Sequence, residues 1–228
     1  MENLNNIHQR TFEWFASRIG YFTGSEVGKL MVTSKKKGET FGDTAKSYIM
    51  KKLAERHLID EIKLDEDVFN EYQHINSVSS RAMQFGTDNE PIARKLIMKE
   101  LGETFQEVGS IPHPTVPWYS SSPDGVTPDR TMCLEIKCPN IDTFINYKCH
   151  VRNGSQLKTE NSVYYWQAQS HMAVTGAKVC VFVVFNPFLK KPLHHFTVER
   201  NEEDINALIE RINAANDLIK DYESEFNI

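Results

Sequence analysis

The sequence predicts a mixed α/β protein in which helices flank a central sheet of four or five strands. Two long stretches, residues 81–101 and 201–222, carry apolar residues at the spacing of a helix. Between them, residues 178–185 are almost continuously apolar, which is typical of a strand buried on both faces. With 228 residues, 40% of them hydrophobic and 25% charged, the chain fits one domain over residues 1–228.

The N-terminal part of the chain is predicted to be helical. Three short helices are expected there, at residues 7–16, 26–31 and 43–53. Residues 59–79 are acidic and then polar, so we interpret them as a variable connection. The long helix that follows is expected to end at Gly102, because glycine readily takes the left-handed conformation of a helix C-terminus.

The pattern changes from helix to strand after Gly102. Alternating or continuous apolar residues predict strands or extended segments at residues 104–111, 118–122, 131–137, 178–185 and 193–199. Pro123, Asp124 and Gly125 predict a turn. Amphipathic helices are expected at residues 160–174 and 201–222.

Composition argues against several classes of protein. No apolar run approaches the roughly 18 residues of a membrane-spanning helix, and no basic segment followed by an apolar stretch opens the chain, so a cytoplasmic protein is expected. The four cysteines lack the spacing of a zinc or iron–sulfur site, and no histidine is assigned to a metal. The net charge of −5 argues against a polybasic nucleic-acid binder, but it does not exclude an enzyme that acts on a polyanion.

Two short segments concentrate the chemistry. The turn delivers Asp124, and the strand that follows contains Glu135, Ile136 and Lys137. Because side chains alternate along a strand, Glu135 and Lys137 lie on the same face. The two carboxylates and the Ile136 carbonyl are hard oxygen ligands suited to Mg²⁺ or Mn²⁺, and the lysine is placed to orient water or stabilise negative charge. The alternative is an exposed turn aspartate followed by a structural Glu–Lys pair.

These residues resemble the PD-(D/E)xK motif of the lambda-exonuclease and YqaJ-type viral recombinase nucleases. Three further segments agree in order: residues 18–26 are similar to the family's RxGxxTxSE pattern, residues 85–93 to its WGxxxExxA helix, and residues 164–169 to its YxxQxQ helix. The resemblance runs from about residue 14 to residue 187. It implies a restriction-endonuclease-like core.

The resemblance also implies a set of metal-binding and catalytic residues. Two Mg²⁺ ions, for which Mn²⁺ can substitute, are expected on Asp124, Glu135, Glu90 and the Ile136 carbonyl. Gln167 matches the motif glutamine that contacts the lysine or the attacking water.

A second set of residues is implied for the 5′-phosphate of the digested strand. Arg18, Ser25 and Ser122 match the residues that hold this phosphate, and Lys35 matches a basic loop residue. The residue that wedges apart the terminal base pair falls near Met83.

One position departs from the family pattern. Thr143 stands where an arginine of the phosphate-binding region is expected. Lys148 and Arg152 are the candidates to replace that arginine.

The activity implied by the family is 5′-to-3′ digestion of linear double-stranded DNA to mononucleotides, leaving a 3′ overhang. The resemblance also implies a homotrimeric ring, a single-strand-annealing recombinase as partner, and a phage or prophage gene in a bacterial cell. The alternatives are a Cas4-like or RecB-like nuclease of other polarity, a structure-specific endonuclease, and a non-catalytic DNA-end-binding protein. Loss of an acidic ligand or of the lysine would favour the last alternative, and all of these residues are present.

Overall fold

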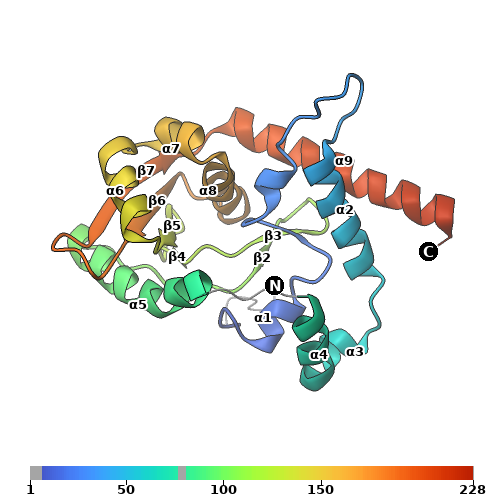
Figure 1. Cartoon of the computed structure of the whole chain (residues 1–228), viewed down its shortest axis with the longest axis horizontal. Coiled ribbons are helices and arrows are strands. Elements are labelled where there is room, and N and C mark those ends of the chain that lie inside the picture. Colours follow the sequence, from blue (N-terminus) through green and yellow to red (C-terminus); the bar gives the residue numbers. More distant parts are fainter. Residues whose placement is uncertain (1–6, 77–80, 228) are drawn as a thin grey trace.

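The computed structural model describes residues 7–76 and 81–227 (Figure 1). Residues 1–6, on which the expectation of no signal peptide rests, lie outside the described residues, as do residues 77–79 of the predicted connection. The main sheet is mixed, with strand order β4-β5-β6-β7. Its strands are β4 (Gly125–Val126), β5 (Met132–Lys137), β6 (Val179–Phe185) and β7 (Leu193–Glu199). β5 and β6 run parallel, and the other neighbours are antiparallel.

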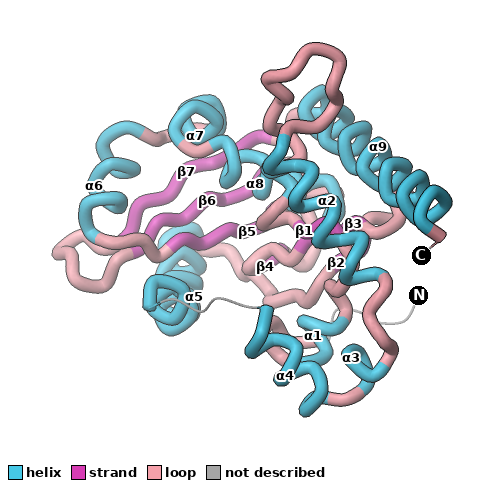
Figure 2. The backbone as a smooth tube through the Cα atoms, turned by 45° about the vertical axis from the view of Figure 1, so that its right-hand side comes forward, coloured by secondary structure: helices cyan, strands magenta, loops and turns pink. Residues whose placement is uncertain are grey.

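Helices cover both faces of this sheet (Figure 2). On one face lies α5 (Arg81–Leu101), and on the other lie α6 (Ile141–His150), α7 (Gly154–Glu160) and α8 (Ser162–Thr175). The alternation along β6 explains this arrangement: Val181 and Val183 belong to the core under α5, whereas Phe182 and Val184 belong to the core shared with α8. The apolar run over residues 178–185 is therefore a strand buried on both faces, as predicted.

A smaller sheet and the remaining helices complete the chain. The small sheet has the order β1-β3-β2, formed by β1 (Phe22–Thr23), β3 (Tyr119–Ser121) and β2 (Ile111–Pro112). α9 (Glu202–Phe226) packs on α8 and on α2 (Asp43–Arg56), while α1 (Phe12–Ala16), α3 (Glu61–Leu64) and α4 (Glu66–Asn76) form a separate group with a small apolar core. No helix among the described residues is both long enough and apolar enough to cross a membrane.

The structure corrects four of the predicted elements. Of the helix expected at residues 7–16, only α1 (Phe12–Ala16) is helical, because Arg10 has a φ of 70°, which an α-helix does not allow. Residues 26–31 contain only the 3₁₀ turn η2 (Val27–Lys29), which packs tightly on α8. Residues 59–76 hold the helices α3 and α4 rather than an irregular connection. Residues 104–111 are not a continuous strand, because their neighbour β4 is two residues long and leaves only a single bridge between Gln106 and Val126.

The structure adds α6 and α7 between β5 and α8, where no helix was predicted. Their N-caps are asparagines, Asn140 and Asn153, whose side chains accept hydrogen bonds from backbone N–H groups. The predicted end of α5 is confirmed, since Gly102 has a φ of 69°.

Candidate active site

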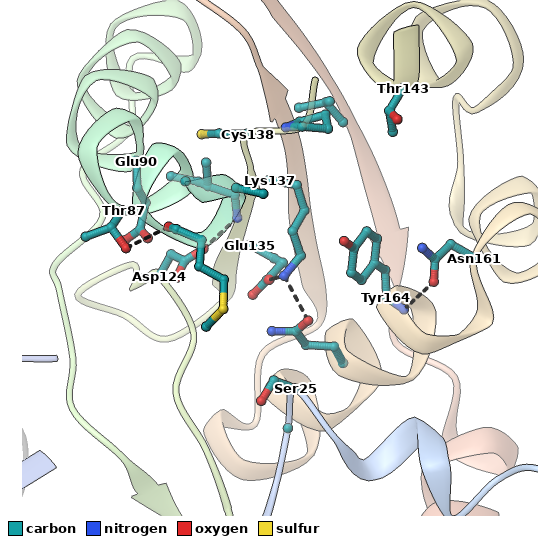
Figure 3. Close-up of a pocket in the computed structure, with 18 of the residues that line it drawn as sticks. Ser25, Thr87, Glu90, Asp124, Glu135, Lys137, Cys138, Thr143, Asn161 and Tyr164 are labelled. Atoms are coloured by element: carbon teal, nitrogen blue, oxygen red, sulfur yellow. Dashed lines mark hydrogen bonds and ion pairs between the residues drawn. The ribbon is translucent and has the colours of Figure 1, made fainter. Parts of the chain in front are cut away.

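The residues of the predicted motif line one pocket of about 920 Å³ (Figure 3). Its walls come from α5, the end of β5, α8 and the segment around α1. Nine of the predicted site residues border it: Arg18, Ser25, Glu90, Ser122, Asp124, Glu135, Ile136, Lys137 and Gln167. Met83 and Thr143 border it as well. Lys35 does not; it lines a separate depression beside the start of α2.

Asp124 is fixed to β5 by backbone contacts. Its N–H donates to the Leu134 carbonyl at 2.9 Å, and its Oδ2 accepts from the Ile136 N–H at 2.6 Å. Burial, together with the charges of Glu135 and Glu90, raises the pKa of Asp124 well above its ordinary value. The three carboxylates are therefore close enough to repel one another, which is the arrangement that a bound cation relieves.

Glu135 and Lys137 form an ion pair on one face of β5, with 2.5 Å between Lys137 Nζ and Glu135 Oε1. Nζ also donates to Gln167 Oε1 at 3.1 Å and lies 4.6 Å from the centre of the Tyr164 ring. Burial lowers the pKa of Lys137, but Glu135, Tyr164 and Asp124 outweigh burial and hold the pKa above its usual value. Lys137 therefore stays protonated at neutral pH.

A buried histidine on α8 holds the other oxygen of Glu135, and the sequence pattern did not reveal it. His171 Nε2 lies 2.6 Å from Glu135 Oε2, and its Nδ1 lies 2.7 Å from Ser121 Oγ. The side chains of His171 and Glu135 are 1% and 2% exposed, so this chain of contacts is shielded from solvent. Burial raises the pKa of Glu135, yet Lys137 and His171 together bring it below its ordinary value. The only sequence clue is that His171 follows Gln167 by four residues, one helical turn along the same face.

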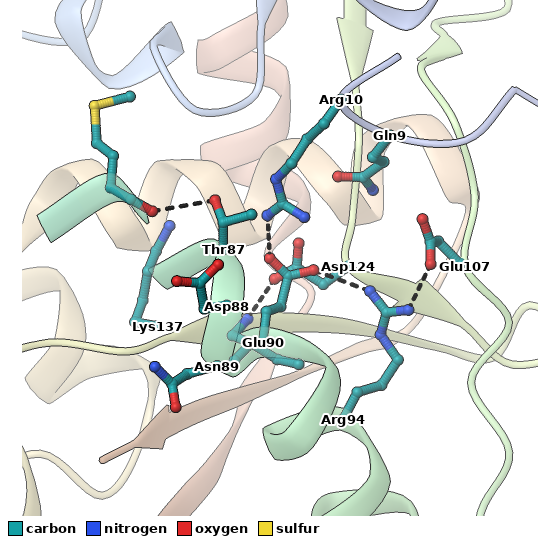
Figure 4. Close-up of polar contacts among 12 residues, drawn as sticks. Gln9, Arg10, Thr87, Asp88, Asn89, Glu90, Arg94, Glu107, Asp124 and Lys137 are labelled. Carbon is teal, nitrogen blue, oxygen red and sulfur yellow. Dashed lines mark hydrogen bonds and ion pairs between the residues drawn. The ribbon is translucent and has the colours of Figure 1, made fainter. Parts of the chain in front are cut away.

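Glu90 reaches the pocket from α5 between two arginines (Figure 4). Arg10 donates to Glu90 Oε2, and Arg94 donates to Glu90 Oε1 at 2.9 Å. The other arm of Arg94 donates to Glu107 at 2.8 Å. Within the described residues no three acidic, histidine or cysteine side chains are gathered closely enough to hold a metal ion as they stand. The contacts of Glu90 explain why it is not gathered with the other carboxylates, because both of its oxygens are turned toward guanidinium groups.

The donors nevertheless fit a hard divalent cation. Asp124, Glu135 and Glu90 supply carboxylate oxygens, and the Ile136 carbonyl adds a backbone oxygen. Burial, with the charges of Glu135 and Glu90 added to it, raises the pKa of Asp124, and a cation bound beside it would favour its ionised form. The cysteine that lines the pocket, Cys138, has a pKa raised by burial to about 12, so it does not compete as a thiolate ligand.

Three of the predicted phosphate-binding residues, Arg18, Ser25 and Ser122, border the pocket on the side near α1. The Arg18 guanidinium stacks 3.8 Å from the Trp14 ring, and Trp14 Nε1 donates to Ser122 Oγ at 3.2 Å. Burial lowers the pKa of Arg18 to about 10, and its Nε is a buried donor with no hydrogen-bond partner among the described residues. Ser25 is exposed at the same pocket.

Neither candidate for the missing arginine occupies the place of Thr143. Lys148 is turned away, since its Nζ donates to the Leu193 carbonyl at 3.2 Å. Arg152 is exposed at the start of α7 and does not border the pocket.

Comparison with known proteins agrees with this fold. The alkaline exonuclease LHK-Exo of Laribacter hongkongensis matches with a TM-score of 0.74 and 28% identity, over 95% of this chain and 96% of that one. Its structure in complex with dAMP matches with the same TM-score and coverage at 29% identity. A phage-related exonuclease of Haemophilus somnus 129PT, 16% identical with a TM-score of 0.69 over 90% of this chain and 96% of that one, shares the fold. No curated protein matches the sequence.

The predicted fold class, an α/β protein with a mixed sheet flanked by helices, is confirmed. The fold places the protein in the class of exonuclease-like α/β proteins. The model of the YqaJ-like viral recombinase domain matches residues 13–178, most of the chain, and the protein belongs to this family.

The repulsion at Asp124 predicts that Asp124→Asn stabilises the metal-free protein. Because the folded pKa of Asp124 is raised, its favourable contribution is present below the unfolded pKa of about 3.9 and is lost as the pH rises through the folded pKa. Asparagine removes the charge and still accepts from the Ile136 N–H. We expect a Tm higher by about 2–4 °C per kcal/mol gained at pH 7–8, measured by calorimetry in EDTA. The gain should shrink toward pH 4, and a lower Tm at pH 8 would contradict the assigned repulsion.

The contact between His171 and Glu135 predicts a separate effect on metal binding. His171→Ala should weaken Mn²⁺ binding by roughly 10- to 100-fold, the usual effect of losing a partner that orients a ligand. His171→Gln can still donate to Glu135 and should recover much of that loss. Isothermal titration with Mn²⁺ measures both variants, and equal affinities for wild type and His171→Ala would show that Glu135 needs no such support.

Proposed function

We propose that this protein is a Mg²⁺-dependent exonuclease that digests double-stranded DNA from 5′ to 3′, releases mononucleotides and leaves a 3′ overhang for recombination by strand annealing. The observation that carries the proposal is the placement of Asp124, Glu135 and Lys137 at one pocket, with Gln167 bound to the lysine. Family membership and the likeness to an exonuclease known in complex with dAMP, a nucleoside monophosphate, support it.

Different side chains of the pocket are assigned different roles in hydrolysis. Asp124, Glu135, Glu90 and the Ile136 carbonyl would hold two Mg²⁺ ions, which lower the pKa of water and neutralise phosphate charge. Lys137 remains protonated, so it serves as a charged donor to the developing negative charge rather than as the base. Gln167 fixes the position of Nζ through its carbonyl oxygen.

Polarity in this proposal comes from the side of the pocket near Arg18. A terminal phosphate carries close to two negative charges near neutral pH, whereas an internal diester carries one. Arg18 has a buried Nε without a partner, and Ser25 and Ser122 border the same space. A 5′-phosphate placed there would satisfy the donor that the free protein leaves unpaired.

Three parts of the proposal rest on the family resemblance. They are a homotrimeric ring around the DNA, a single-strand-annealing recombinase as partner, and a phage or prophage origin with action in the bacterial cytoplasm. A ring would keep a protein of net charge −5 on a polyanion without a large basic surface.

Digestion of linear duplex DNA, with closed circular duplex as the comparison, tests the activity. We expect mononucleotide release from linear DNA only when Mg²⁺ is present, loss of activity in Asp124→Ala and Glu135→Ala, and a fall of about 10²-fold or more in Lys137→Ala. The exposed Lys220 is the matched control, and Lys220→Ala should retain full activity. Cleavage of the circle, or near-normal digestion by Asp124→Ala, would overturn the proposal.

End-labelled duplexes that differ only in their 5′ group test the polarity. The phosphorylated end should be digested roughly 10- to 150-fold faster than the hydroxyl end, the range that one charge-assisted hydrogen bond supplies. Arg18→Ala should nearly erase this difference, whereas Arg130→Ala, a change at an exposed turn, should preserve it. Equal rates at both ends, or release of the 3′ label first, would contradict the predicted polarity.

A further inference from the structure

The segment before α1 is anchored over the candidate active site. The Gln9 side-chain amide donates to the carbonyls of Val108 and Pro123, both at 2.9 Å, and Pro123 directly precedes Asp124. Thr11 caps α1 by accepting from the Trp14 N–H. Between these two anchors, Arg10 has a φ of 70°, a backbone conformation that arginine rarely adopts. The anchors thus hold an unusual backbone conformation at the residue whose side chain enters the pocket (Figure 4).

The two arginines on Glu90 differ in how firmly they are held. Arg94 lies on the same helix as Glu90, is 15% exposed, and is shared between Glu90 and Glu107. Arg10 comes from a different part of the chain, is 40% exposed, and contacts the second oxygen of the same carboxylate. Glu90 carries one negative charge and is already paired with Arg94. Arg10 can therefore leave Glu90 with the loss of fewer contacts than Arg94 would lose.

A divalent cation on Glu90 would compete directly with Arg10. Metal and guanidinium would both need the same carboxylate oxygens, and their like charges would repel each other at contact distance. Arg94 can keep its contact with Glu107, whereas Arg10 faces the open pocket, where a nucleic-acid backbone is expected. A planar guanidinium with several donors suits a phosphate better than any other protein cation.

We propose that Arg10 is a positioning residue that exchanges partners: it neutralises Glu90 in the free protein and, once metal binds, turns its guanidinium to a phosphodiester oxygen of the DNA. This inference rests on the proposed function and adds to it a residue outside the family motifs described above. Arg10 differs in place from Arg18, which stacks on Trp14 near Ser122, so the two arginines hold different phosphates.

The first experiment measures metal binding without DNA. Isothermal titration with Mn²⁺ compares wild type, Arg10→Ala and Arg10→Lys, with Arg130→Ala as the control at an exposed turn. Removing the competing cation should tighten Mn²⁺ binding about 3-fold or more in Arg10→Ala. Arg10→Lys keeps a charge and should stay near wild type. Weaker or unchanged Mn²⁺ binding in Arg10→Ala would overturn the exchange, since Arg10 would then merely support Glu90.

The second experiment measures DNA binding in Ca²⁺, by fluorescence anisotropy of a labelled duplex. Arg10→Ala should bind about 10-fold more weakly, and its salt dependence should fall by about one phosphate contact. Arg10→Lys should lose part of this affinity because it lacks the planar fork. Equal DNA affinity and equal salt slope in Arg10→Ala and wild type would overturn the phosphate contact.

The same titrations separate failure of this inference from failure of the proposed function. Mn²⁺ that does not bind to the wild type, or that binds equally to Asp124→Asn, would remove the metal site and with it both proposals. If Mn²⁺ affinity falls in Asp124→Asn but does not change in Arg10→Ala, only the proposed exchange of Arg10 between partners is contradicted. Thermal melts of each variant show that the compared proteins are folded, and Arg10→Gln, which also removes the charge, provides the reading if Arg10→Ala is not.

Discussion

The burial of three carboxylates around one pocket is the constraint on which the rest of the site depends. Asp124, Glu135 and Glu90 are each less than one-tenth exposed, and an unpaired charge in such surroundings is strongly unfavourable. Each carboxylate has its own partners. Asp124 accepts a hydrogen bond from the Ile136 N–H, Glu135 contacts Lys137 and His171, and Glu90 contacts two arginines. Of these three, only Asp124 has no cation in contact among the described residues, and it is the carboxyl whose pKa is raised.

The fold delivers these groups because β5 is short and buried on both faces. Leu134 and Ile136 point into the core under α5, which forces Glu135 and Lys137 to the opposite face, toward α8. α8 meets them with Gln167 and His171, spaced one helical turn apart. A shift of one residue in the register of β5 would send both charged side chains into the apolar core. The same packing that stabilises the sheet therefore fixes which side chains reach the pocket.

Much of this was predictable from sequence, because it depends on local patterns. The alternation of residues 131–137, the turn at Asp124 and the continuous apolar run of β6 predicted the strands that carry the site. His171 and Arg10 were not predicted, because a histidine inside an apolar helix and an arginine before a short one have no distinguishing pattern. Their roles depend on contacts 36 and 80 residues away in sequence. α6 and α7 were missed for a related reason, since both are short and packing on β6 and β7 supplies their stability.

Among the unfavourable features of the free protein are two at groups that we propose bind ligands. Arg18 has a buried Nε without a partner, and Asp124 is a carboxyl whose ionised form is opposed by its neighbours. An anion would pair with Arg18 and a cation would pair with Asp124, and both side chains line the same pocket. A polyanionic ligand bound together with divalent metal would satisfy the two at once, whereas either alone would leave the other unrelieved. This complementarity also explains how a chain of net charge −5 can bind a polyanion. Binding depends on the positive and negative groups inside the pocket rather than on the total charge of the protein.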